Sequence, residues 1–386
     1  MSSERFFEEA DRIEYWKAIG RITRRGTLSD LAVSDLARIR EALGTGDTER
    51  AMGYLDHVHR MSLWMNASWI EWAITWAAFV EERFSKEEAT RINRLAYDAW
   101  RAGVSRYGDG TDEEHAALEL ATRLLTPFEG GLEELARYRQ AEVAGVPPRV
   151  SELHAEPNRT HSEIIGAIEE GDPEKASAGV ERYARQARAR HDLLAKYTWA
   201  YPGVVTEQHG QRVTEEGIRR SLELCGWYDD LWDLVARLDP EALAAVMAEE
   251  LRAHHSGPDR DGSVRIEEDA DRFRLIFEPC GSGQAMRQDA DRDSASGFGV
   301  LLEPSPSTWG RAGEVPSYCA HCAVGEIASI ERMGYPAWVT EFDPDASHPC
   351  GWTVFKDPDA IPEEYFRRLG SVKDPSAFRR PSREAP

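Results

Sequence analysis

The chain has 386 residues, of which 41% are hydrophobic and 30% are charged, values typical of a globular protein rather than a disordered or fibrous one. Asp and Glu total 69 against 47 Lys and Arg, which gives a formal net charge of -22 at pH 7. This acidic surplus argues against nucleic acid and anionic membrane surfaces as partners, because both are recognised by basic surfaces.

The N-terminal third contains one long apolar segment. The first residues of the chain show no basic segment followed by an apolar core, so we expect no signal peptide and a cytoplasmic protein. Residues 61–80 carry a single charge, Glu71, and are long enough to cross a bilayer. Asn66 and Glu71 lie near the middle of this segment, and a carboxylate is costly in lipid. We therefore expect a buried helix and no membrane association.

Two segments of the chain resemble each other. ARIREALGTGDTERA at 37–51 and SEIIGAIEEGDPEKA at 162–176 align without a gap. Each carries a Gly-Asp pair, which suits a helix stop followed by an N-cap, so both predict a helix, a tight turn and a second helix. Carrying the alignment forward pairs Trp72 with Tyr197. The pattern predicts two copies of one helical unit.

Tryptophans recur along one face of the helix expected at 61–80. The stripe fits either packing between the two copies or the wall of a substrate pocket that includes Glu71, Trp72 and Tyr197. Glu71 and Lys196 are equivalent in the alignment, and we expect them to face each other.

The pattern changes to a period of two near residue 262. Segments 272–279, 336–343 and 350–356 read as strands, and 319–334 reads as a helix that ends at a glycine. Residues 281–316 are rich in Gly, Ser, Asp and Pro, as in a lid-like loop. The C-terminal third is therefore predicted to be α+β.

Four of the five cysteines lie in this third, at the ends of the expected elements. A Cys-x-x-Cys pair lets two thiolates bind one tetrahedral ion. We expect zinc, and the ligands are Cys280, Cys319, Cys322 and Cys350, with His321 or His348 able to replace one thiolate. The rival interpretation is a thiol redox pair at the start of a helix, which lowers a thiol pKa.

A closed set of four thiolates is typical of structural zinc, whereas a catalytic site needs an open position. If the zinc site is catalytic, we expect Glu326, which follows Cys322 by one helical turn, to serve as the base. We expect His321 to donate a proton.

The expected substrate site lies where the loop 281–316 closes over the cysteines. Gly281, Ser282 and Gly283 leave the backbone bare for the close approach of a ligand, and Trp309 offers an apolar cover. The alternative is that the glycines only shape a zinc knuckle and Trp309 caps a core.

Three pieces of the C-terminal third carry a family resemblance: FEPCGSGQ, SYCAHCAVGEIASIERMGYP and SHPCGWTVFK. They resemble the L-2-amino-thiazoline-4-carboxylate hydrolase family and the 4-vinyl reductase domain, which holds zinc with cysteines. The resemblance implies a small-molecule domain with a zinc ion.

Together the sequence predicts an α+β protein in which two tandem duplicated all-helical units precede a small α+β zinc-binding domain. The main hypothesis is a zinc-containing, hydrolytic enzyme acting on a small aromatic or heterocyclic molecule. The alternatives are a ligand-binding or scaffold protein with structural zinc and a thiol redox protein, and a homodimer is left open. The expected boundaries are 1–140 and 141–258 for the helical units, 259–370 for the metal domain and 371–386 for a disordered tail.

Overall fold

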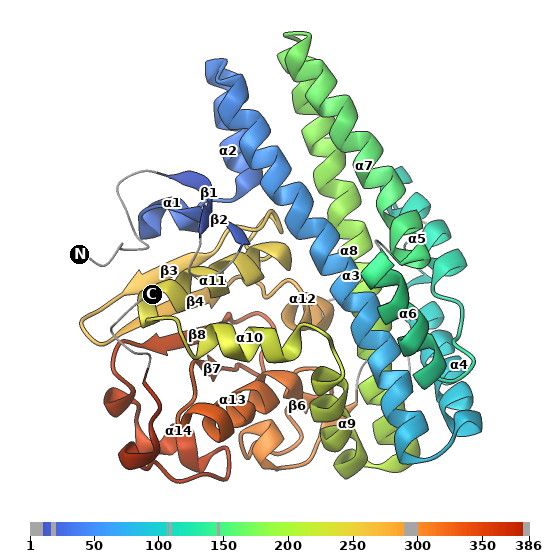
Figure 1. The fold of residues 1–386 in the computed structure, drawn as a ribbon, viewed down its shortest axis with the longest axis vertical. Helices are drawn as coiled ribbons and strands as arrows, with labels where there is room; N and C mark the ends of the chain where they lie inside the picture. Colours follow the sequence, from blue (N-terminus) through green and yellow to red (C-terminus); the bar gives the residue numbers. More distant parts are fainter. Residues whose placement is uncertain are drawn as a thin grey trace.

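The structure is a computed structural model that describes residues 11–16, 21–105, 107, 110–144, 147–288 and 300–380. Long helices form one side of the molecule, and small antiparallel sheets with short helices form the other (Figure 1). This agrees with the α+β class predicted from the sequence.

The described chain opens with a two-stranded antiparallel hairpin that the sequence analysis missed. Strand β1 (Arg12–Trp16) pairs with β2 (Arg21–Arg25), and the short helix α1 (Leu28–Ala32) follows. The strands are five residues each, RIEYW and RITRR, and β2 carries one apolar residue, so the alternation of period two in β1 is short and is not continued in its partner.

The first long hairpin consists of α2 (Asp35–Thr45) and α3 (Thr48–Arg83). Gly46 ends α2 with a φ of 74°, which a residue with a Cβ rarely adopts, and the Asp47 side chain accepts a hydrogen bond from Arg50 N at the start of α3. The predicted Gly-Asp turn is confirmed here.

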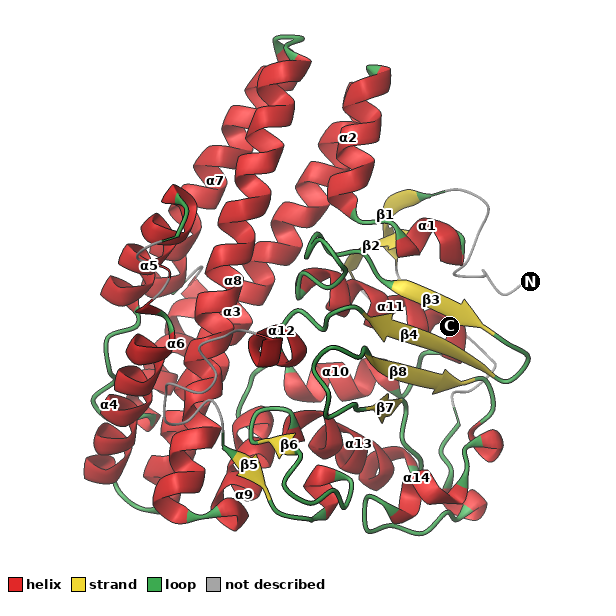
Figure 2. Ribbon diagram, turned by 180° about the vertical axis from the view of Figure 1, so that it is seen from behind, coloured by secondary structure: helices red, strands yellow, loops and turns green. Residues whose placement is uncertain are grey.

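The second hairpin repeats this geometry. It consists of α7 (Pro148–Glu169) and α8 (Pro173–His209), with Gly171 at a φ of 71° and Asp172 capping Lys175 N. Figures 1 and 2 show the two hairpins rising side by side. The duplication of a whole unit stays a prediction.

Shorter helices surround these hairpins. Figures 1 and 2 both show α10 between α11 and α13. The bounds are α4 (Lys86–Gly103), α5 (Asp112–Leu124), α6 (Leu132–Ala144), α9 (Gln211–Glu223), α10 (Tyr228–Val235), α11 (Pro240–Ala253), α12 (Gly283–Gln288), α13 (Ala320–Met333) and α14 (Glu363–Arg367).

A four-stranded antiparallel sheet of order β3-β4-β8-β7 organises the C-terminal third. Its strands are β3 (Arg265–Glu268), β4 (Arg272–Phe277), β8 (Cys350–Phe355) and β7 (Val339–Glu341). A small separate pair joins β5 (Leu301–Leu302) to β6 (Val315–Pro316). The strands and the helix expected in this third are thus present, and α13 ends at Gly334, which has a φ of 84°.

One hydrophobic core joins the three expected units. Buried residues from α3, α8, α11 and the sheet belong to the same cluster. Tyr318, which precedes α13, packs its ring 6.2 Å from that of Trp69 on α3 and 5.2 Å from that of Trp199 on α8. The expected boundaries near 140 and 258 therefore do not separate independent cores.

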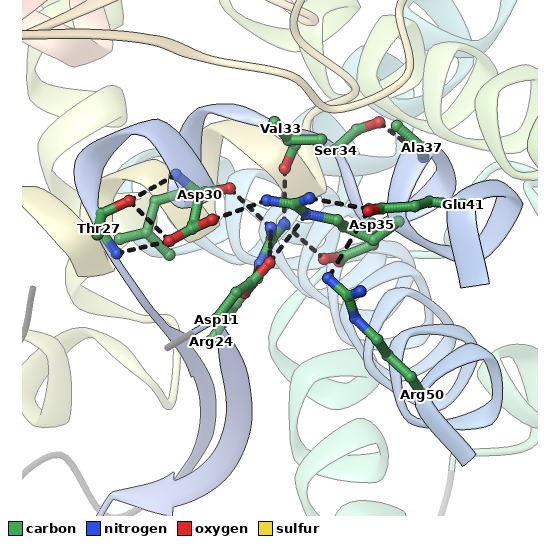
Figure 3. Close-up of polar contacts among 12 residues, drawn as sticks. Asp11, Arg24, Thr27, Asp30, Val33, Ser34, Asp35, Ala37, Glu41 and Arg50 are labelled. Carbon is green, nitrogen blue, oxygen red and sulfur yellow. Dashed lines mark hydrogen bonds and ion pairs between the residues drawn. The ribbon is translucent and has the colours of Figure 1, made fainter. Parts of the chain in front are cut away.

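Figure 3 shows a network of polar contacts around Arg24 that joins the N-terminal hairpin to α1 and α2. Arg24 is fully buried and contacts Asp11 at 2.7 Å and Asp35 at 3.1 Å. Asp35 in turn lies 2.9 Å from Nδ1 of His57 on α3. A chain of side chains with alternating charge thus links the hairpin to α2 and α3.

The first part of the tail expected to be disordered is packed. Phe378 contacts the rings of Tyr335 and Phe366 at 5.4 and 6.1 Å, and Arg379 N donates to the carbonyl of Met333. The aromatic side chain explains the difference, because it adds buried apolar area to a polar segment. Residues 381–386 lie outside the described residues.

The described helices, including the one that contains 61–80, are too short or too polar to qualify as membrane spans.

Candidate active site

A cavity of about 600 Å³ lies between α3, α10, α11 and α13. Its wall is rich in aromatic side chains: Trp64, Trp69, Trp72, Trp227, Tyr228, Trp232, Tyr318, Trp338 and Trp352. A pocket of this size suits a small organic molecule.

Two stacked tryptophan pairs form much of this wall. Trp69 and Trp72 on α3 lie 5.8 Å apart at 14°, because residues three apart share one helix face. Trp232 on α10 and Trp338 before β7 lie 5.7 Å apart at 6°. Trp72 is fixed by a hydrogen bond from its indole N–H to Ser221 Oγ at 2.9 Å. The walls are held in place by packing.

A thiol–imidazole pair opens into the cavity at the first turn of α13. Nδ1 of His321 lies 2.6 Å from the carbonyl oxygen of Tyr318, which only accepts, so Nδ1 carries the proton. Burial lowers the pKa of His321 to about 4, which leaves Nε2 as an acceptor. Sγ of Cys322 lies 3.5 Å from that nitrogen. The arrangement is a nucleophile, a base and a group that orients the base.

The pKa of the Cys322 thiol is well above its ordinary value, first because of burial and then because of repulsion by the neighbouring Cys319. The resting pair is therefore a neutral thiol that donates to a neutral imidazole. Both residues line the cavity and are only half-buried.

A second acid–base group on the cavity wall follows α11. Nε2 of His254 lies 3.3 Å from Oε1 of Glu250, and its Nδ1 lies 3.2 Å from Nε2 of His191. Glu250 and His254 both line the cavity, whereas His191 is buried behind it. Each ring nitrogen of His254 thus has a polar neighbour, Glu250 at Nε2 and His191 at Nδ1.

His191 is oriented by Asp192. Its Nδ1 lies 2.9 Å from the Asp192 carboxylate, so this nitrogen carries the proton, and burial lowers the pKa of His191 to about 4. Burial opposes ionisation of Asp192, but the charge of Arg260 at 2.7 Å outweighs it and keeps the pKa of Asp192 below its ordinary value. His191 is therefore a neutral acceptor for the Nδ1–H of His254.

The two acid–base groups are neighbours. The imidazole of His254 contacts Trp69 at 5.5 Å and that of His321 contacts Trp72 at 5.5 Å, and these two tryptophans are stacked. Burial dominates the lowered pKa of His321, and His254 and Glu250 also act on it through their charges.

The four cysteines expected to bind zinc gather beside this site. The pKa of Cys319 is raised by burial and also by the nearby Cys350 and Cys280. The pKa of Cys322 is raised by burial and by the other three thiols, those of Cys319, Cys280 and Cys350. Among the described residues, however, no group of three or more His, Cys, Asp or Glu side chains is arranged to hold a metal ion. The thiols as placed here form no such arrangement, so we derive no chemical step from a metal.

His348 does not join the cysteines. Its side chain is 63% exposed and lies 3.3 Å from Asp343. The turn before β8 directs it to solvent, so it contributes neither a replacement ligand nor a cavity residue.

The expected catalytic role of Glu326 is not supported. Its side chain is fully buried, with Oε1 accepting from Trp309 Nε1 at 3.1 Å and Thr340 N at 2.9 Å, and Oε2 pairing with Arg368 at 2.9 Å. It is not among the residues that line the cavity. Its carboxylate is occupied by these partners, and it ties the helix to β7.

Trp309 was expected to cover the cysteine face, and the structure places it elsewhere. Its ring stacks on Phe342 at 5.4 Å and lines a separate cavity of about 320 Å³. The hydrogen bond to Glu326 holds it there. Residues 289–299, the middle of the expected lid, lie outside the described residues.

The Gly281–Gly283 segment serves close packing within the chain rather than the approach of a ligand. A Cβ on Gly281 would lie 1.4 Å from the carbonyl oxygen of His254, and one on Gly283 would lie 2.8 Å from Sγ of Cys319. Ser282 is buried, with its Oγ 3.4 Å from Sγ of Cys280. Gly281 thus allows the end of β4 to press against the end of α11, which positions His254.

Of the helical residues expected at the substrate site, only Trp72 lines the cavity. Glu71 lies 3.2 Å from Arg139 and accepts from Gly226 N, whereas Lys196 lies over the Tyr107 ring, so the two do not face each other. Tyr197 is buried against Trp100 and Phe128 and belongs to the core.

The Glu250–His254 pair and the His191–Asp192 pair behind it were not predicted from the sequence. A signal existed for the first, because Glu and His four residues apart share one helix face. Nothing in the sequence connects residues 191 and 254.

Comparison with protein-family models, curated proteins and solved structures finds no match to this chain. Its function is therefore argued from the site alone.

Proposed function

We propose that this chain is a hydrolytic enzyme that acts on a small aromatic or heterocyclic molecule held in the tryptophan-walled cavity. One observation carries the proposal: the Cys322–His321 pair and the Glu250–His254 pair line the same cavity.

Cys322 is the proposed nucleophile. Its thiol gives the proton to Nε2 of His321 while the sulfur bonds to an acyl carbon of the substrate, and His321 then passes this proton to the leaving oxygen or nitrogen as that bond breaks. In the second step His321 takes a proton from water, the resulting hydroxide attacks the thioester, and the proton returns to the sulfur. The carboxyl product leaves, and the thiol is restored.

The Glu250–His254 pair orients the substrate. Glu250 offers a carboxylate at the cavity wall, and the chain from Asp192 through His191 fixes the ring of His254. Held in this way, the pair can hydrogen-bond to the substrate with little reorganisation.

A Cys-x-x-Cys redox function is less well supported. Thiol–disulfide exchange needs an accessible thiolate. Cys319 is buried and is not among the residues that line the cavity, so the pair offers one accessible thiol, that of Cys322.

Zinc at the four cysteines stays a prediction of the sequence, and a ligand-binding protein with a structural zinc is the second candidate function. It is favoured by the gathering of four thiols at one place. The two candidates differ at Cys322, which is a metal ligand in one and a free nucleophile in the other.

A ligand screen with a blocking variant tests the proposal. Ser68 lines the cavity, and Ser68→Phe fills part of it. Ser162→Phe is the matched control, because Ser162 is an exposed helical serine that donates to the carbonyl four residues earlier, as Ser68 does. Ligand-observed NMR with aromatic esters, amides and heterocycles is expected to show binding that Ser68→Phe abolishes and Ser162→Phe keeps.

Mass spectrometry of the same mixtures then detects hydrolysis. We expect products with the wild type and none with Cys322→Ala, although Cys322→Ala still binds the substrate. Binding without any hydrolysis by the wild type would favour the non-enzymatic candidate.

A further inference from the structure

The charges around the cavity are mostly negative. The described residues that line it include the carboxylates of Asp230, Asp233 and Glu250 but only one guanidinium, that of Arg237, and no lysine. Arg237 follows α10, and its Nε donates to the carbonyl oxygen of Asp233 at 2.8 Å. Carboxylates therefore outnumber guanidinium groups among the described residues of the wall, which disfavours an anionic ligand.

The aromatic wall adds a second attraction for positive charge. The face of an indole or phenol ring attracts a cation through its quadrupole, and aromatic cages are a recurring site for organic ammonium groups. The cavity presents stacked tryptophans from α3 and from α10, so rings approach it from more than one side.

Two rings of this wall already contact a cation of this chain, Arg332, which is not itself among the residues that line the cavity. The guanidinium carbon of Arg332 lies 5.3 Å from the ring centre of Tyr228 and 6.0 Å from that of Trp232, and both rings line the cavity. Asp229 completes this arrangement with an ion pair to Arg332 at 2.9 Å. Tyr228 and Trp232 thus combine with a carboxylate of α10 to bind a cation.

We propose that the ligand of this cavity is an aromatic molecule that carries a positive charge, such as a quaternary or protonated amine. The inference rests on the proposed function, since it assumes that the cavity is the ligand site, and it adds the chemical class of the substrate. The aromatic rings surround the cationic group, and the carboxylates of α10 and α11 attract it to the mouth. The net charge of -22 favours its approach from a distance.

Three probes of similar size test the charge directly: phenyltrimethylammonium, its neutral isostere tert-butylbenzene, and benzoate. Their dissociation constants are measured with the full chain by quenching of tryptophan fluorescence, with calorimetry as a check. We expect the cation to bind about tenfold more tightly than the isostere, and benzoate to bind least.

Equal binding of tert-butylbenzene and the cation would overturn the inference and leave the proposed ligand site intact. Tighter binding of benzoate would do the same. If the wild type binds none of the three, the cavity is not the proposed ligand site, and the inference fails with it.

Three isosteric variants of α10 show which carboxylates contribute to binding of the cationic ligand. Asp230→Asn and Asp233→Asn each remove a carboxylate that lines the cavity, and we expect each to weaken binding of phenyltrimethylammonium about two- to fivefold. Asp229→Asn is the matched control, because it changes the net charge equally but removes a carboxylate that is 81% exposed and pairs with Arg332. Unchanged binding of tert-butylbenzene shows that each variant keeps its cavity. An equal loss of cation affinity in all three variants would mean that no local carboxylate contacts the ligand, which contradicts the proposal.

Discussion

His57 Nε2 lies 3.1 Å from the carboxylate of Glu249 in the interior of the chain, and the next residue on α11, Glu250, lines the cavity. Asp35 lies on the other side of the same imidazole at 2.9 Å. Arg252 extends the chain of charges from Glu249 to the carbonyl oxygens of Leu31 and Val33. The buried network therefore fixes the end of α11 that carries the cavity's acid–base pair.

The charge of His57 gives the free energy of unfolding a specific pH dependence. Burial opposes protonation, but Asp35 and Glu249 outweigh it and raise the pKa of His57 to about 10. An unfolded histidine has a pKa of about 6.5, so this contribution is complete below pH 6.5 and is lost as the pH rises through 10. We expect the stability of the wild type to fall over that window.

His57→Gln removes this contribution. It leaves Asp35 and Glu249 without their shared cation, and we expect a loss of about 3–5 kcal/mol in the free energy of unfolding at pH 7 and a flatter alkaline limb. Urea unfolding from pH 6 to 10 measures both. His348→Gln, at an exposed histidine, is the control and should change stability by less than about 0.5 kcal/mol. If the free energy of unfolding falls between pH 6.5 and 10 by the same amount in the wild type and in His57→Gln, His57 is uncharged in the folded protein.

His191 is expected to remain neutral across the physiological range, with its proton on Nδ1. Burial lowers its pKa to about 4, and Asp192 accepts the Nδ1–H. Nitrogen-15 NMR of labelled histidine reports both the tautomer and the titration. In Asp192→Asn, we expect the proton of His191 to be shared between its two ring nitrogens. Protonation of His191 near pH 6.5 in the wild type would contradict the hydrogen-bonded chain from Asp192 through His191 to His254.

Glu326→Gln separates the structural role of this residue from the catalytic role that the sequence predicts. We expect a loss of about 1–3 kcal/mol in stability, because Arg368 loses its ion partner, together with unchanged ligand binding in the cavity. Glu331→Gln, on the same helix but paired at the surface with Arg219, is the control. Hydrolysis that disappears in Glu326→Gln while stability is kept would restore Glu326 as the base.

The zinc prediction is tested by metal analysis of the purified chain. The sequence predicts one zinc ion per chain, lowered in Cys350→Ser and unchanged in Cys225→Ser, because Cys225 is buried apart from the cluster between Thr75 and Ser221. Metal-free wild-type protein in which all five thiols react after unfolding would refute zinc and leave Cys322 free to act as a nucleophile.

The sequence predicted features that depend on neighbours along the chain. The Gly46–Asp47 turn and the helix that ends at Gly334 follow from local residue preferences and spacing. The use of Trp72 in a cavity wall also agrees with the aromatic stripe.

Features set by contacts distant in sequence were not predictable. The hydrogen bond between His191 and His254 depends on how α8 packs against α11, and no local pattern reports that packing. Glu326 looked like a base because it lies one turn after Cys322. Its partners, Thr340 and Arg368, come from other elements and could not be inferred from spacing.

The most direct test of the central claim is a crystal structure of the protein with an aromatic ligand from the binding screen. The account predicts that the ligand ring lies among Trp72, Trp232 and Trp338, within reach of Cys322 and Glu250. Electron density for the ligand in the smaller cavity beside Trp309, or on the outer surface, with the tryptophan-walled cavity free of ligand, would contradict the account.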